Sequence, residues 1–387
     1  MSYYTNFYEQ TCYTYMGPGS VKQVGISAKE KGITKMMIVT DPFLAKQENV
    51  VGKVKKSLED NGIEYVVFDK INVDPLDTIV YEGEEFAKAE KVNGLVGVGG
   101  GSSMDAAKSI DILMTNPRPL SQYYYSWDYK PGPPVFEVPT TTGTGSENTY
   151  YSVISDTTLN VKKVPLKKPD LAICDPELTY GLPAGLTAAT GMDAFAHAAE
   201  TMTGMIQCAL TDALCGFGIT LLMNNLPTAV EQPDNKEARD NLMIASNLIG
   251  RGFGVMGCHL GHAIGQCIGA RYHTTHGISC AWPLPATMEY SAISEPEKVK
   301  MVADYMGLKY PENISNERIG KLVSEAISDF MHVVHIKPMS EYGIDRDGLI
   351  GIADIVMEDN CWPVIPRELT KPELEELLGK VYDSYQG

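Results

Sequence analysis

Histidines gather in one short segment of this sequence. Four of the seven histidines lie between His259 and His276. His262 and His276 are fourteen residues apart and therefore come from two separate elements. Upstream, Asp193 and His197 are spaced i, i+4, which puts both side chains on one face of a helix. One carboxylate and three imidazoles suit a divalent transition metal such as Fe(II) or Zn(II), with a position left open for a substrate.

A glycine-rich segment follows a predicted strand. Residues 97–105 read Gly-Val-Gly-Gly-Gly-Ser-Ser-Met-Asp, after the apolar run 94–98 and before a helical pattern that begins at Ala106. Successive glycines let the backbone approach a pyrophosphate, and the helix N-terminus offers unpaired N–H groups. The segment matches neither GxGxxG nor a Walker loop, and a tight turn between strand and helix is the alternative. Its setting favours phosphate binding.

A second polar loop lies at residues 139–147, Pro-Thr-Thr-Thr-Gly-Thr-Gly-Ser-Glu, after the apolar run 135–138. Its hydroxyls and glycines suit phosphate, ribose and nicotinamide, because open α/β sheets bind ligands at the carboxyl ends of their strands. Asp41 also ends a predicted strand. A carboxylate there holds ribose hydroxyls and repels a 2′-phosphate, which predicts NAD rather than NADP. The alternative for Asp41 is a simple turn residue.

Together these segments resemble the iron-containing (group III) alcohol dehydrogenase family. The resemblance runs over nearly the whole chain, in the family's order, and rests on GGGSSMDAAK (99–108), PTTTGTGSE (139–147), DPEL (175–178), PAGLTAATGMDAFAHAAE (183–200) and the segment from His262 to His276. It implies a Rossmann-like N-terminal domain and an all-helical C-terminal domain, with the active site in the cleft between them. It also implies NAD, one divalent metal ion and a homo-oligomer.

The resemblance assigns roles to individual residues. Its metal ligands are Asp193, His197, His262 and His276. Its cofactor-binding residues are Gly99, Gly100, Gly101, Ser102, Asp105, Thr140, Thr141, Thr144, Lys163, Leu178 and Leu182. Cys361 matches a position near the substrate pocket.

The sequence also departs from the family's pattern. Gln266 stands where the family usually has a second histidine, four residues after the first metal histidine of the C-terminal pair. That histidine is thought to relay a proton from the substrate oxygen, and glutamine hydrogen-bonds but does not titrate. His273 or a chain of waters is the candidate replacement. His259 stands where small residues are common.

Further departures concern the substrate. Tyr150 and Tyr151 add bulk and hydroxyls on the expected pocket side, and Arg251 and Arg271 stand in segments that are normally apolar. The expected function is an NAD(H)-dependent and metal-dependent alcohol dehydrogenase or aldehyde reductase for a small primary alcohol or aldehyde. Because a guanidinium pairs well with anions, a sulfoacetaldehyde or succinate semialdehyde type of substrate is an alternative; structural ion pairs are the other explanation of the arginines. Two further alternatives are a related glycerol dehydrogenase or dehydroquinate-synthase-like enzyme, and a non-catalytic protein that binds NAD or a metal.

Two regions with different patterns must position these residues. In the first, apolar runs alternate with helical segments, which predicts a doubly wound α/β sheet with strands at 35–40, 63–68 and 94–98. In the second, long amphipathic patterns predict helices at 186–202, 209–224, 236–249 and 319–332, and a last helix that Thr370 caps. We therefore expect an α/β dinucleotide-binding domain at 1–181 and a helical metal-binding domain at 182–387.

The composition excludes several classes of protein. A hydrophobic content of 44% with 21% charged residues describes a folded chain. The formal net charge of −17 argues against nucleic-acid or anionic-membrane partners, because phosphate binding needs a basic field.

Cysteine usage and the absence of targeting signals predict the compartment. The eight cysteines are scattered without a CxxC pair, which predicts reduced, mostly buried thiols in a cytoplasmic protein. The first ten residues lack the pattern of a signal peptide, and no apolar run reaches the ~18 residues of a membrane helix. His332 and His335 are expected to be packing or surface residues.

Overall fold

The computed structural model describes residues 8–159, 161–206 and 208–386, and these divide into two compact units. The first, called here the sheet unit, comprises Gln10–Thr141 and Gly145–Tyr180. The second, the helical unit, runs from Gly181 onward and includes Thr142–Thr144 of the polar loop. That residues 1–181 and 182–387 form two separate domains stays a prediction.

The sheet unit is built on six parallel strands in the order β1-β8-β5-β4-β2-β3. The strands are β1 (Tyr13–Met16), β2 (Lys35–Val39), β3 (Glu64–Phe68), β4 (Gly94–Gly99), β5 (Val135–Pro139) and β8 (Leu171–Cys174). A separate antiparallel pair is formed by β6 (Ile154–Asp156) and β7 (Val161–Lys163). The predicted α/β sheet is confirmed, and the three strands predicted from apolar runs are β2, β3 and β4.

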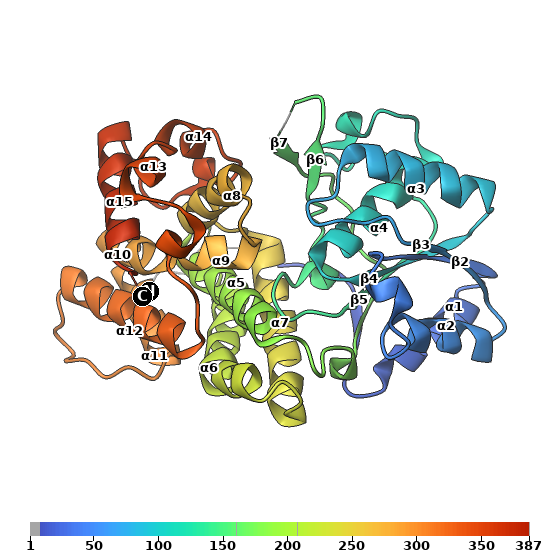
Figure 1. Cartoon of the computed structure of the whole chain (residues 1–387), viewed down its shortest axis with the longest axis horizontal. Helices are drawn as coiled ribbons and strands as arrows, with labels where there is room; N and C mark the ends of the chain where they lie inside the picture. The colour runs from blue at the N-terminus through green and yellow to red at the C-terminus, as the bar shows by residue number, and fades with distance from the viewer. Residues whose placement is uncertain (1–7, 160, 207, 387) are drawn as a thin grey trace. The chain divides into compact units, whose positions relative to one another are not determined.

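Alternate residues of each strand pack on opposite faces of this sheet, as the two-residue period of a strand requires. Met36 and Ile38 belong to a core with α1 (Gln23–Glu30) and α2 (Val51–Asp60). Met37 and Val39 belong to a core with two other helices, α3 (Asp77–Ala89) and α4 (Gly101–Thr115). Figure 1 shows α1 and α2 on one face of the sheet and α3 and α4 on the other. Both faces are thus covered, which is why the central strands β2 and β4 are mostly apolar and buried.

The helical unit packs its helices around α5. Residues 187–203 of this helix are buried except Thr190, and they contact α6, α7 and α9. Its helices are α5 (Ala184–Thr203), α6 (Ala209–Glu231), α7 (Lys236–Met256), α8 (Leu260–Tyr272), α9 (His276–Ala281), α10 (Leu284–Ser294), α11 (Pro296–Tyr305), α12 (Asn316–Val333), α13 (Arg346–Ile350), α14 (Ala353–Met357) and α15 (Lys371–Asp383). The predicted cap of the last helix is present, since the backbone N–H of Thr370 donates to the Glu373 carboxylate at 2.8 Å.

Helix α6 is longer than its sequence pattern suggests. It continues through Pro227 to Glu231, whereas the amphipathic pattern predicted an end near residue 224. By length and composition α6 is the one helix in the described part of the chain that would be long and apolar enough to cross a membrane. Its Cys215, Ile219 and Leu222 side chains are buried in the same core as α5 and α7.

Glu137 is a fully buried carboxyl group in the middle of the sheet unit. It lies on β5, and neither of its oxygens has a hydrogen-bond partner among the described residues. Burial raises the pKa of Glu137 well above its ordinary value of 4.5; Lys108 opposes this shift, and Asp105 and Glu147 add to it. The folded protein therefore keeps the Glu137 proton to a higher pH than the unfolded chain does.

We predict that Glu137→Gln stabilises the protein at neutral and alkaline pH relative to the parent. The unfolded chain loses the Glu137 proton near pH 4.5, so the parent loses stability as the pH rises from there toward the folded pKa, by up to about 1.4 kcal/mol per pH unit. The variant has no proton to lose. Thermal unfolding measured from pH 4 to pH 8 checks this, with Glu64→Gln, on the exposed side of β3, as the control. A difference in Tm that stays constant with pH would contradict the prediction.

Candidate functional site

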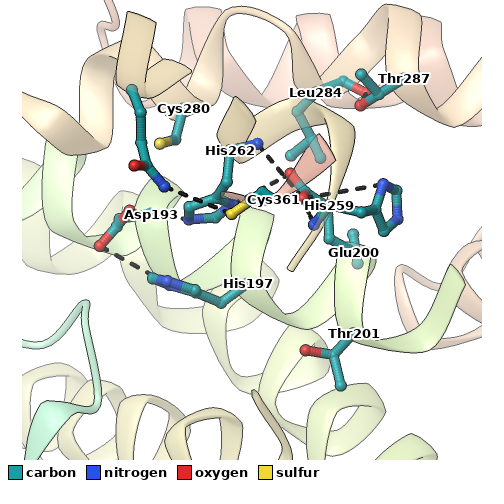
Figure 2. Close-up of polar contacts among 12 residues, drawn as sticks. Asp193, His197, Glu200, Thr201, His259, His262, Cys280, Leu284, Thr287 and Cys361 are labelled. Carbon is teal, nitrogen blue, oxygen red and sulfur yellow. Dashed lines mark hydrogen bonds and ion pairs between the residues drawn. The ribbon is translucent and has the colours of Figure 1, made fainter. Parts of the chain in front are cut away.

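Three helices of the helical unit bring the predicted metal ligands together. Asp193 and His197 come from one face of α5, His262 from α8, and His276 is the first residue of α9. Figure 2 shows Asp193, His197 and His262 as neighbouring side chains. The sequence could place Asp193 beside His197, because that spacing is local; the packing of α8 and α9 on α5 completes the cluster.

Asp193 is at the centre of this cluster. Its Oδ2 lies 3.8 Å from Nδ1 of His197, and its Oδ1 lies 3.9 Å from Nε2 of His262 and 3.6 Å from Nε2 of His276. Three of the four side chains are buried, and the His276 side chain is 36% exposed. The cluster is therefore accessible from the His276 side.

The donor atoms of this cluster fit a metal ion. Nδ1 of His197 and Nε2 of His262 are buried and have no hydrogen-bond partner within the described residues. Leaving such atoms unsatisfied costs about 1–3 kcal/mol each, a cost that a bound cation removes. Burial, with smaller contributions from His262 and His276, holds the pKa of His197 well below its ordinary value, so its imidazole is neutral as metal binding requires.

Glu200 orients His262. Its Oε1 lies 3.2 Å from Nδ1 of His262, and its Oε2 accepts the backbone N–H of His259 at 2.6 Å. Burial raises the pKa of Glu200, but His262 and His259 outweigh it and hold the pKa below its ordinary value. The carboxylate thus accepts the Nδ1 proton and leaves Nε2 of His262 facing Asp193 (Figure 2).

This arrangement makes proton and metal compete at His262. Burial lowers the pKa of His262, whereas Cys280 and Glu200 raise it and prevail, so the pKa lies well above its ordinary value. A metal ion at Nε2 must therefore displace a proton. Sequence reasoning missed Glu200, although an acidic residue seven positions after Asp193, on the same face of an apolar helix, is a usable signal.

His259 supports the cluster from behind. It is buried immediately before α8, and its Nε2 lies 3.0 Å from the hydroxyl of Thr203. Burial lowers its pKa. Two further histidines lie away from the cluster: His332 packs against the ring of Tyr385, and His335 pairs with Glu231 at 2.6 Å.

The residues considered for proton transfer differ in their surroundings. Gln266 lies one turn after His262 on α8, and its amide donates to Sγ of Cys361 at 3.5 Å. His273 ends α8 in the left-handed conformation, with φ +55°, and its side chain is exposed. Within the described residues the His273 side chain makes no hydrogen bond or ion pair. The structure thus places Gln266, but not His273, in contact with a residue predicted to line the substrate pocket.

Cysteine thiols also surround the cluster. Cys280 lies one turn after His276 on α9, and burial raises its pKa to about 11, with His262 opposing that shift. A hydrogen bond with Cys361, together with burial, raises the pKa of Cys258 well above its ordinary value. Sequence reasoning did not assign Cys258 or Cys280 to the site.

The glycine-rich turn of the sheet unit joins β4 to α4. Gly99 has φ +154°, which favours glycine, and a Cβ there would lie 2.6 Å from the Ser103 hydroxyl. Gly100 is the N-cap of α4, which begins at Gly101 and continues with Ser102. Among the described residues, no side chain makes a capping hydrogen bond to this end of the helix. The first turn of this fifteen-residue helix therefore offers backbone N–H groups to an anion.

The second polar loop lies beside this turn. The Thr140 N–H donates to the Gly99 carbonyl at 2.9 Å, and a Cβ on Gly100 would lie 3.5 Å from the Thr141 hydroxyl. Thr140 is buried, whereas Thr141 and Thr144 are partly exposed. Thr144 is grouped with the helical unit.

Asp105 holds the end of the second polar loop and the chain segment after it, at Ser146 and Val153. Its carboxylate accepts the Ser146 hydroxyl at 2.6 Å and the Val153 N–H at 3.1 Å, and it lies 3.1 Å from the Lys108 ammonium. The side chain is thus engaged within the sheet unit and shapes the turn from behind.

The remaining predicted cofactor residues lie in separate places. Oδ1 of Asp41 accepts the backbone N–H groups of Phe43 and Leu44 at 2.8 and 2.9 Å, which is a turn role. Lys163 ends β7, and Leu178 is buried in the sheet unit. Leu182 belongs to the helical unit, where its carbonyl accepts from Arg239 at 2.8 Å.

The predicted substrate residues also divide between the units. In the sheet unit the rings of Tyr150 and Tyr151 are tilted by 58° with their centroids 4.6 Å apart, and Trp127 packs edge-on against Tyr150. In the helical unit the half-buried Arg251 donates to Asn247 at 3.1 Å. Arg271 is exposed and lies over the ring of Tyr272.

Comparisons with known proteins agree with this architecture. Residues 13–176 match the family described as iron-containing alcohol dehydrogenase, and residues 187–382 match the C-terminal part of the Fe-containing alcohol dehydrogenase family. The chain belongs to this family. The predicted family, fold class and enzyme class are confirmed.

Similar proteins of this family match along most of their length. The NAD-dependent methanol dehydrogenase of Bacillus methanolicus is 33% identical over 382 residues, which cover 97% of this chain and 99% of that protein. The sulfoacetaldehyde reductase of Bilophila wadsworthia is 34% identical over 87% of this chain and 89% of that protein. The crystal structure of a 1,3-propanediol oxidoreductase superposes with a TM-score of 0.92 at 31% identity, over 97% of this chain and 100% of that one.

We predict that Glu200→Gln weakens metal binding about 10–100-fold, because the neutral amide no longer fixes His262 with Nε2 toward Asp193. Competition with a chelator measures the loss, and circular dichroism checks the fold. His276→Ala, which deletes a predicted ligand, is the comparison and should bind metal more weakly still. Unchanged metal affinity in Glu200→Gln would contradict the orienting role.

Proposed function

We propose a small primary alcohol or aldehyde as the substrate of this enzyme, an NAD-dependent alcohol dehydrogenase that uses one divalent metal ion. The observation that carries the proposal is the buried cluster around Asp193. In this cluster Glu200 contacts Nδ1 of His262, which leaves Nε2 of His262 facing the Asp193 carboxylate. Relatives of the family act on methanol and sulfoacetaldehyde, as their names state.

We assign the cofactors to the residues that the sequence predicted. The metal is held by Asp193, His197, His262 and His276. The N-terminus of α4, with Gly99, Gly100, Gly101 and Ser102, receives the pyrophosphate. Contacts to the rest of NAD come from the other predicted residues: Asp41, Thr140, Thr141, Thr144, Lys163, Leu178 and Leu182. Asp105 supports the turn from behind.

The chemistry divides between the cofactors and the chain. When bound, the metal polarises the substrate oxygen as a Lewis acid, and the nicotinamide ring gives or takes the hydride. The neutral imidazole of His197 supplies a lone pair without a proton. The side chains position the substrate carbon, which supplies much of the rate of such reactions. We place Tyr150, Tyr151, Arg251 and Cys361 around the substrate.

A proton must also move between the substrate oxygen and water. Gln266 hydrogen-bonds but does not titrate, so it positions the substrate oxygen or a water molecule rather than accepting a proton. The exposed His273 is three residues before the ligand His276, so solvent water reaches its imidazole directly. We assign the relay to His273, through water.

A second candidate is the reduction of a small aldehyde that carries a sulfonate or carboxylate. The half-buried guanidinium of Arg251 supports it, as does the 34% identity to a sulfoacetaldehyde reductase. Sulfoacetaldehyde and succinate semialdehyde are the representative substrates.

Location, assembly and metal identity complete the proposal. We place the enzyme in the cytoplasm, because eight scattered cysteines without a CxxC pair are typical of reduced thiols. A homodimer follows from resemblance to the family. Carboxylate and imidazole ligands accept both iron and zinc, so availability decides which metal is loaded.

We predict that, of three aldehydes, propanal gives the highest kcat/KM when the metal-loaded enzyme is assayed by NADH oxidation, with sulfoacetaldehyde and succinate semialdehyde as the others. A higher kcat/KM for either anion, lost in Arg251→Gln, would establish the second candidate instead. NADH binding without turnover of any aldehyde would support a non-catalytic protein.

We predict that His273→Asn lowers kcat and shifts its pH profile, because the exposed proton acceptor is lost. The double variant Gln266→His/His273→Asn should recover kcat, since it restores an imidazole one turn after His262. Profiles of kcat against pH, measured at saturating substrate, test this. An unchanged profile in His273→Asn would remove His273 from the relay.

A further inference from the structure

Lys108 is a fully buried lysine on α4, two turns after the glycine-rich turn. Its ammonium group donates to the Ser146 hydroxyl at 2.7 Å and to the backbone carbonyls of Ser146 and Tyr151 at 3.1 and 2.6 Å. Oδ1 of Asp105 lies 3.1 Å from the same nitrogen. An ammonium group is costly to bury unless it is paired and hydrogen-bonded, and its three donors are engaged here within the sheet unit.

The partners of Lys108 belong to residues 146–153, a segment that α4 also holds at a second point. The hydroxyl of Ser152 donates to the backbone carbonyl of Asp105 on α4 at 2.5 Å. The segment carries Tyr151, which the sequence places at the substrate. Helix α4 therefore fixes this segment by contacts that are independent of its own N-terminus, where the pyrophosphate is expected.

The backbone of Tyr151 is held from two sides. It forms an antiparallel bridge with Leu166, and its carbonyl accepts from Lys108. The half-buried ring lies beside that of Tyr150, with the two hydroxyls 3.4 Å apart. Because only two rotatable bonds separate a tyrosine ring from its backbone, fixing the backbone restricts where the ring lies. Loss of the Lys108 ammonium would release one of the two sides.

We propose that Lys108 is a positioning residue for the substrate, because it holds the Tyr151 carbonyl and thereby the ring that contacts the substrate. This inference rests on the placement of Tyr151 in the proposed function. Lys108 stands in the glycine-rich segment that resembles a cofactor motif, yet its donors point to the segment with Tyr151. Helix α4 then has two tasks: its first turn receives the pyrophosphate, and Lys108 holds a substrate residue.

The test is a double-mutant cycle in the full-length, metal-loaded enzyme, assayed with the preferred aldehyde of the three above. Lys108→Met should raise KM for the aldehyde about tenfold, the size of one lost substrate contact, with a smaller change in kcat. In Tyr151→Ala, where no ring is left to position, the same substitution should add no further increase. Equal increases in both backgrounds would make Lys108 a general support of the fold and overturn the proposal. A KM that is not raised in Tyr151→Ala would overturn it as well.

Binding of NADH gives a readout that does not depend on turnover. Measured by NADH fluorescence, the Kd should be nearly unchanged in Lys108→Met, because the N–H groups offered to the pyrophosphate belong to the first turn of α4. A loss of NADH affinity as large as the increase in KM would assign Lys108 to the cofactor and contradict the proposal.

Lys298→Met is the matched control. It removes another buried ammonium group, which pairs with Asp212 in the helical unit, and should lower Tm without changing KM for the aldehyde. An equal increase of KM in this control would show that lost stability, rather than the contact with Tyr151, determines KM.

The cycle also covers a variant that fails to fold. If Lys108→Met does not fold, Asp105→Asn/Lys108→Met carries the same comparison without leaving an unpaired buried carboxylate. No turnover of any of the three aldehydes by the parent would refute the proposed function, and this inference with it. Turnover by the parent with additive effects in the cycle would refute the inference alone.

Discussion

The contact between the Glu200 carboxylate and the His262 imidazole is the constraint on which the metal centre depends. Glu200 is fully buried and joins α5 to the start of α8 by accepting both the His262 ring nitrogen and the His259 backbone N–H. The approach is so close that a Cβ on Gly261 would lie 2.1 Å from the carboxylate oxygen. A buried charge without partners would cost several kcal/mol, so the two helices hold one register, and that register sets the distance between His262 and Asp193.

Small residues let the three helices approach closely enough for this register. A Cβ on Gly277 of α9 would lie 2.1 Å from the Ala189 carbonyl oxygen on α5, and a Cβ on Gly265 of α8 would lie 2.8 Å from Sγ of Cys280 on α9. Larger residues at these places would separate the helices and the donor atoms they carry. The small alanine side chains of α5 likewise leave room for polar side chains to meet inside an apolar core.

Local patterns were visible in the sequence and long-range packing was not. The spacing of Asp193 and His197 fixes their common face, and two of the apolar runs became the buried strands β2 and β4 while the third became the edge strand β3. By contrast, the place of Cys280 depends on how α9 packs against α8, and the role of Glu200 on contacts that span about sixty residues. Asp105 is similar: the resemblance implied a cofactor role for it, and the sequence could not show that a distant loop supplies its hydrogen-bond donors, the Ser146 hydroxyl and the Val153 N–H.

Gln266 and the nearby thiols together change the chemistry of the site from that of the family's usual pattern. Where the resemblance leads one to expect a second imidazole, the chain has a glutamine whose amide contacts Cys361, and Cys361 in turn contacts Cys258. In place of an imidazole that would titrate near neutral pH, the chain has the Gln266 amide, which does not titrate. Beside it are the thiols of Cys258 and Cys280, whose pKa values burial raises. This part of the cluster thus offers an amide and thiols, rather than a second imidazole, as partners for a proton. In the proposed mechanism the proton therefore passes to the surface on the side of His276, whose side chain is 36% exposed, through the exposed His273 that follows α8.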